Sequence, residues 1–191
     1  MAKRYRSNAG TAQTLAYQMV QPKLSAAERD FEQVVGDAAG RKNANILIEA
    51  AKKYALLAAQ SSQNPPHSAK QWERITKLWE EAIKQLKMVT IKESGYVDAQ
   101  NKLAEYQNNL GIAQLRKETE EESIKALGDA KRMIPSWQKM AGKEDANGGE
   151  LSAELQKIIN ELEKVKPGTT SHKEAQELLK FARESIKKLQ P

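Results

Sequence analysis

Apolar residues recur along this chain at intervals of three and four positions, which is the spacing of one face of an α-helix. The strict alternation of apolar and polar residues that is typical of half-buried strands is missing. Only ten glycines and six prolines interrupt the pattern, and most of them occur together at a few places. The pattern therefore predicts an all-α protein built from amphipathic helices.

Two helices are predicted near the N-terminus. The first covers Thr11 to Val20 and is closed by Pro22. The second begins at Ser25, where Ser25–Glu28 forms a capping box. Its apolar stripe is Phe31, Val34, Val35 and Ala38, and Gly40 is expected to end it.

A third helix is predicted from Asn43, which can cap it. Its expected inner face is Ile46, Ala50, Tyr54, Leu57 and Ala58. A loop is then predicted over Ser61 to His67, because two consecutive prolines cannot continue a helix. Ser68 to Gln71 is a second capping box, and the helix that follows has the inner face Trp72, Ile75, Trp79, Ile83 and Leu86.

A long helix is predicted after the turn at Lys92 to Gly95. It runs from Tyr96 to about Met133, where Pro135 is expected to stop it. Its expected inner stripe is Ala99, Leu103, Tyr106, Leu110, Ala113, Ile124, Leu127 and Ala130. The charged stretch Arg116 to Glu122 interrupts this stripe, so we expect solvent on all sides there.

Two shorter helices are predicted in the remainder. One covers Glu150 to Val165 after a loop at Lys143 to Gly149, and the last begins at the capping box Ser171–Glu174. The predicted architecture is antiparallel helical hairpins stacked in a bundle or short solenoid, with one long central helix. The predicted divisions are residues 1–66 (N-terminal helices), 67–134 (a hairpin with a long second helix) and 135–191 (a C-terminal hairpin), or one continuous core.

A shift of 76 residues brings the two hairpins into register. Ile83 falls on Ile159, Leu86 on Leu162, Val89 on Val165, and Ala99-Gln100 on Ala175-Gln176. Any two amphipathic hairpins share some apolar positions, but the common Ala-Gln pair and the equal loop length go beyond helix periodicity. An internal duplication is therefore one hypothesis, and chance periodicity is the other.

The segments Trp79-Glu-Glu-Ala-Ile83 and Tyr96-Val-Asp-Ala99 resemble the helices of tetratricopeptide-like helical-repeat modules. The hairpin from Trp79 to Leu110 is also similar to helical hairpins of cyanobacterial multidomain proteins. The match covers Ala44 to Lys117 and more weakly Leu151 to Leu189, but the spacing of 76 differs from that family's 34-residue period. The resemblance implies protein–protein interaction by stacked helices and transfers no binding residue.

Composition narrows the function further. There is no cysteine, which excludes disulfides and thiolate chemistry. The net charge of +6 favours an acidic partner, but acidic residues recur throughout the chain. Nucleic-acid or anionic-surface binding through the basic N-terminus (Lys3, Arg4 and Arg6) and scattered lysines is therefore the alternative function. No stretch is apolar enough to span a bilayer. We expect a cytoplasmic protein or a soluble part of a larger or anchored one, of undetermined oligomeric state.

Catalytic motifs are not recognisable. No phosphate-binding glycine loop and no metal-ligand spacing occurs, and His67 and His172 read as solvated turn residues. The sequence therefore predicts no enzyme, no cofactor and no metal site, and an enzyme whose active-site residues come together only in space is the third hypothesis. The leading hypothesis is a non-catalytic adaptor or scaffold that binds a protein partner in a groove between hairpins.

Three aromatic residues are the candidates for partner binding: Trp72, Trp137 and Tyr96. Trp72 lies seven positions before Trp79, so both occupy one helix face; Trp79 is expected in the core, and Trp72 at a groove edge. Trp137 follows Pro135 in a polar segment, where it either covers the end of the core or belongs to a contact patch. Tyr96 and Tyr106 are expected to fix the hairpin with their hydroxyls near solvent.

Overall fold

The computed structural model describes residues 29–30, 33–34, 36 and 38–189. The all-α prediction is confirmed for these residues, which contain helices and turns but no strand. The predicted helix Thr11–Val20, the capping box Ser25–Glu28 and the basic residues Lys3, Arg4 and Arg6 lie outside the described part of the chain.

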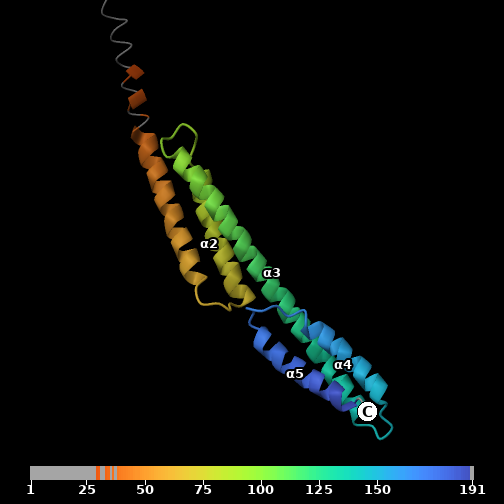
Figure 1. Cartoon of the computed structure of the whole chain (residues 1–191). Helices are drawn as coiled ribbons and strands as arrows, with labels where there is room; N and C mark the ends of the chain where they lie inside the picture. Colours follow the sequence, from red (N-terminus) through yellow and green to blue (C-terminus); the bar gives the residue numbers. More distant parts are fainter. Residues whose placement is uncertain (1–28, 31–32, 35, 37, 190–191) are drawn as a thin grey trace, which may run out of the picture.

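The described helices are a first helix over residues 38–61, α2 (Ala69–Lys87), α3 (Tyr96–Ala141), α4 (Gly148–Leu162) and α5 (His172–Leu189). Together they form a long rod, and α3 runs through most of its length (Figure 1). The first helix and α2 lie beside the first part of α3, whereas α4 and α5 lie beside its later part. With 46 residues, α3 is about 69 Å long at 1.5 Å per residue.

Two separate clusters of buried apolar side chains stabilise the rod. The first joins the first helix, α2 and α3 as far as Ala113, and the second joins α3 from Ala126 onward to α4 and α5. Each part of the rod is therefore a three-helix unit, and α3 belongs to both. The division at 66/67 and 134/135 stays a prediction, but the first cluster combines residues from both sides of position 66, and α3 runs through position 135.

Helix α2 follows its sequence pattern closely. The Ser68 hydroxyl accepts a hydrogen bond from the Gln71 backbone N–H at 3.3 Å, which caps the helix as the Ser-x-x-Gln pattern predicts. All five predicted inner residues are buried, and the ring of Trp79 packs 5.4 Å from that of Tyr106 on α3. The placement of Trp79 in the core is thus confirmed.

The prediction for the preceding helix was wrong in two respects. Gly40 does not end a helix and Asn43 does not begin one, because residues 38–61 form one continuous helix. Its buried face also differs in part. Ala58 is buried as predicted and Tyr54 packs against the cluster, but the rest of the buried face is Ala44, Leu47, Ile48, Ala51 and Ala55. The helix has apolar residues on both sides, and small alanines allow close approach to α2 and α3, so the larger residues Ile46 and Leu57 are left exposed.

Helix α3 also departs from its prediction. It continues through Pro135 to Ala141, because proline removes one backbone N–H and its exposed position lets water reach the carbonyl that loses this partner. Met133, Ile134 and Trp137 pack against the second cluster on either side of the proline and hold the helix together. Ile124, expected inside, is about half exposed.

The turn between α2 and α3 and the turn between α4 and α5 share their backbone hydrogen bonds. Four backbone hydrogen bonds recur 76 positions apart. At the end of the first helix of each pair, Met88 N–H to Gln85 O corresponds to Lys164 N–H to Glu161 O, and Val89 N–H to Leu86 O corresponds to Val165 N–H to Leu162 O. At the start of the next helix, Tyr96 N–H to Glu93 O corresponds to His172 N–H to Thr169 O, and Ala99 N–H to Gly95 O corresponds to Ala175 N–H to Ser171 O. In the first turn, Gly95 lies close to the first helix, since a Cβ there would lie 3.0 Å from the Ile48 side chain and 3.1 Å from the Ala44 side chain. The second turn instead uses Gly168 at a φ of 78°.

Candidate functional site

A groove of about 610 Å³ runs along the first three-helix unit. It lies between the first helix and α3, and α2 forms its floor. The lining extends from Lys52 and Glu105 at one end to Pro65 and Arg116 at the other. The loop before α2, which contains Pro65, lies near the middle of the rod (Figure 1). A concave apolar surface with a few polar groups at its edge is the usual form of a binding site.

The floor and the walls of this groove are apolar. Trp72, Ile75 and Trp79 of α2 form the floor, together with the ring of Tyr106 on α3. These floor residues are buried, whereas the walls carry Leu56, which is 58% exposed, and Ile112, which is 52% exposed. Two large aliphatic side chains therefore face solvent across an apolar floor, where a further apolar surface would cover them.

Polar and charged groups stand along the rim. Lys52 pairs with Glu49 on its own helix at 2.6 Å, and the Lys52 ammonium holds the pKa of the Glu49 carboxyl below its usual range. Glu105 and Arg116 line the groove from α3, and Asn109 lies between them. Burial raises the pKa of the Tyr106 phenol, and the adjacent Glu105 carboxylate raises it further. Tyr106 is therefore neutral near pH 7, and its hydroxyl is a donor as well as an acceptor.

The three aromatic candidates from the sequence lie in different places. Trp72 lines the groove, but it is only 8% exposed, so it supports the floor and is not a projecting anchor. Tyr96, at the first position of α3, is half-buried against the first cluster, twenty positions before Arg116. Trp137 belongs to the second unit. The structure therefore does not bring these residues together.

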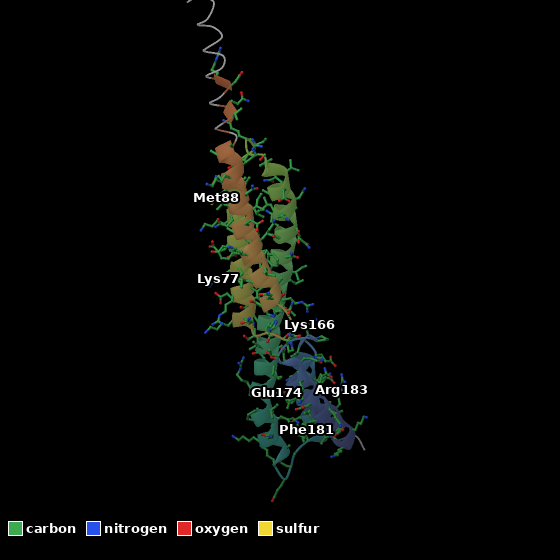
Figure 2. All side chains as sticks on the ribbon, turned by 90° about the vertical axis from the view of Figure 1, so that its left-hand side faces the viewer. Lys77, Met88, Lys166, Glu174, Phe181 and Arg183 are labelled. Carbon is green, nitrogen blue, oxygen red and sulfur yellow. The ribbon has the colours of Figure 1, made fainter. Side chains whose placement is uncertain are left out.

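Trp137 packs against the end of the second cluster, which is one of the two expectations for it, and its part in a contact patch stays a prediction. Its indole N–H donates a hydrogen bond to the Leu151 carbonyl at 3.2 Å, and its ring meets that of Phe181 edge-on at 6.3 Å. The bond to α4 makes it part of the end of the second cluster. Phe181, on α5, is 53% exposed beside it (Figure 2).

The sequence search missed the residues that shape the groove. Leu56, Ile112, Glu105 and Arg116 were not singled out, because each lies beside the core stripe of its helix. The one available signal was the presence of large aliphatic residues outside the predicted stripes. That signal is weak, since isolated apolar residues are common on protein surfaces.

The prediction that solvent surrounds α3 from Arg116 to Glu122 was wrong. Glu120 is 1% exposed, and its carboxylate accepts hydrogen bonds from the backbone N–H of Thr170 at 3.1 and 3.2 Å and from the Thr170 hydroxyl. Ser123, one turn later, accepts from the Lys166 N–H at 3.1 Å. Lys166 marks this level of the rod in Figure 2. The polar stretch thus binds the α4–α5 turn to α3.

The two histidines differ from the solvated residues that the sequence indicated. His67 is half-buried with its ring 5.2 Å from Trp72, and its Nε2 atom is buried without a hydrogen-bond partner among the described residues. His172 is also half-buried, at the first position of α5. Within the described ranges, no three histidine, aspartate or glutamate side chains lie close enough together to hold a metal ion.

The groove thus offers an apolar surface, one neutral phenol, an amide, a carboxylate and a guanidinium. No helix in the part of the chain that the structure describes is long and apolar enough to cross a membrane. Comparisons with protein-family models, with curated proteins and with solved structures found no match to the chain.

Proposed function

We propose that this protein is a helical adaptor that binds a segment of another protein in the groove between the first helix and α3. The single observation that carries the proposal is the pair Leu56 and Ile112, more than half exposed on opposite walls above the buried Trp72 and Trp79. Covering such side chains with an apolar surface removes them from water, at about 25 cal/mol per Å².

An α-helix is the partner structure that suits this groove. The groove is bounded by two helices and floored by a third, so an occupying helix would complete a four-helix arrangement. Binding of an amphipathic helix in an apolar groove places residues at i, i+3, i+4 and i+7 against the floor. The resemblance to tetratricopeptide-like modules supports the same general role.

The arrangement of two three-helix units along one rod also fits the function of a scaffold protein. We propose that they arose by duplication, because the turn hydrogen bonds and buried positions recur at the 76-residue offset seen in the sequence. The groove residues do not recur in the same way: Trp79 corresponds to Leu155 and Tyr106 to Ala182. In this proposal the first unit binds the partner and the second extends the rod.

The test is selection of helical peptides from a displayed library on the full chain, followed by affinity measurements with variants. Leu56→Glu and Ile112→Glu place charges on the groove walls without disturbing buried positions. We expect each to weaken a selected peptide at least tenfold. Ile46→Glu and Leu57→Glu are matched controls, since both are exposed on another face of the same first helix, and they should change affinity less than twofold. Peptides that bind all four variants equally would contradict the proposal.

A further inference from the structure

Two charged side chains of opposite sign stand at the two ends of the groove. Glu105 and Arg116 both project from α3 into its lining. They are eleven positions apart, which is close to three full helical turns, so they lie on one side of α3 and about 16 Å apart along its axis. Neither takes part in an ion pair within the described part of the chain.

The other charge on the rim is already neutralised. Lys52 lies at the Glu105 end, but its ammonium is 2.6 Å from the Glu49 carboxylate. Arg116 lies at the opposite end. Its guanidinium is close to Gly168 of the second unit: the Nη1 atom would be 4.0 Å from a Cβ built on that glycine. The rim therefore has an unpaired negative charge at one end and an unpaired positive charge at the other, separated by the apolar residues Leu56 and Ile112.

We infer that the groove takes an amphipathic helix of a partner protein with a fixed direction, with a basic side chain opposite Glu105 and an acidic one opposite Arg116. This inference rests on the proposed function and adds the chemistry of the partner. A helix carries partial positive charge at its N-terminus and partial negative charge at its C-terminus. The partner helix therefore runs in the same direction as α3, with its N-terminal end at Glu105.

A second copy of this chain is a poorer occupant. The exposed apolar face of the first helix, around Ile46, has lysines at both ends, Lys42 and Lys53, and its carboxylate, Glu49, is already paired with Lys52. Such a face offers no unpaired acidic side chain at the end that would meet Arg116. A partner with separated charges matches the groove better, because like charges that face each other across an interface cost binding free energy.

The experiment uses two synthetic helical peptides of identical composition and the full-length protein. Both have the same leucine face and a side-chain staple that fixes the helix. One has lysine near its N-terminus and glutamate three turns later, and the other has these two residues exchanged. Exposed ion pairs contribute little each, so we expect the first peptide to bind about threefold to tenfold more tightly at low salt. The difference should shrink at high salt.

A charge-neutralised protein makes the test specific. In the double variant Glu105→Gln and Arg116→Gln, the preference between the two peptides should disappear, because no unpaired charge remains at either end of the groove to orient the helix. The matched control is Glu177→Gln with Lys187→Gln, which removes exposed charges on α5 and should leave the preference unchanged.

The remaining outcomes separate this inference from the proposal beneath it. If both peptides bind the wild-type protein equally, or if the preference persists in Glu105→Gln with Arg116→Gln, and both peptides lose affinity with Leu56→Glu, the direction is wrong and the groove remains the site. If neither peptide binds the wild-type protein more tightly than Leu56→Glu, the proposed function itself fails. Sedimentation of the protein alone provides the third readout. Self-association that is abolished by Leu56→Glu would make the occupant a second copy and overturn the inference.

Discussion

Glu120 and Thr170 are fifty positions apart in the chain, yet the Glu120 carboxylate accepts hydrogen bonds from both the backbone N–H and the hydroxyl of Thr170. The carboxylate is buried on α3 between the two apolar clusters, and it holds the turn that joins α4 to α5. Hydrogen bonds to a charged group contribute more to stability than neutral ones, and an unsatisfied partner adds a desolvation cost. This contact therefore fixes the second unit to the shared helix.

We predict that Glu120→Ala lowers the free energy of unfolding by about 1–3 kcal/mol. The measurement is equilibrium unfolding in urea. Glu121→Ala is the control, since this neighbouring carboxylate is exposed and forms only an i,i+4 pair with Lys117, and it should have little effect. Equal effects of the two substitutions would show that the Thr170 contact does not stabilise the fold.

Trp79→Ala should lower the free energy of unfolding by about 3–5 kcal/mol, the usual cost of emptying a large aromatic site in a core. Trp79 is buried and packs against Tyr106. Phe181→Ala removes another aromatic ring at a position that is 53% exposed and should cost less than about 1 kcal/mol. Urea unfolding again provides the measurement. A loss below about 1 kcal/mol for Trp79→Ala would place its ring outside the core.

Two glycines are expected to respond to alanine with opposite signs. Gly111 lies within α3, and a Cβ there would meet no atom within 4 Å, so Gly111→Ala should raise the melting temperature through a gain of about 0.5–1 kcal/mol. Gly168 has a φ of 78°, where an L side chain is strained, so Gly168→Ala should lower the melting temperature. Thermal unfolding of both variants provides the measurement. A shift of the melting temperature in the same direction for both variants would contradict the backbone conformation of one of the two glycines.

The acid dependence of stability should contain a contribution from Glu93. The Thr90 backbone N–H, at 2.5 Å, and the amide of Asn43, at 3.1 Å, hold the pKa of its carboxyl below the usual range. A lowered carboxyl pKa stabilises the fold above the unfolded pKa, and that stability is lost as the pH falls through the folded pKa. NMR titration should therefore show a lowered pKa that rises in Asn43→Ala. A pKa that does not respond to this substitution would exclude the contact with the first helix.

Local patterns in the sequence predicted much of this fold. Ser68 caps α2, Tyr96 begins α3, and the inner face of α2 is buried as its spacing indicates, because these features depend on residues within a few turns of each other. The buried face of the first helix was not predictable in this way, since Ile46 and Ala44 both belong to apolar stripes. Only contacts with α2 and α3 decide which stripe is inside.

The candidate site was less accessible to sequence reasoning. Glu120 is buried because it accepts a hydrogen bond from the Thr170 N–H, which belongs to a turn fifty positions away. The charge of Glu120 by itself predicted a solvent-exposed side chain. Leu56 and Ile112 come together only because the first helix and α3 both pack on α2. Trp72 was identified as a groove residue, but its burial makes it part of the floor. The spacing of residues along the chain does not indicate these contacts in space.

The central claim, that the groove binds a helical segment, is tested most directly by tryptophan fluorescence. The chain has three tryptophans, so Trp137→Phe leaves only Trp72 and Trp79, both in the groove lining. We predict that a selected helical peptide without tryptophan shifts their emission saturably at low and at high salt, and that Leu56→Glu abolishes the shift. Unchanged emission on binding, or the same shift in Leu56→Glu, would contradict the claim.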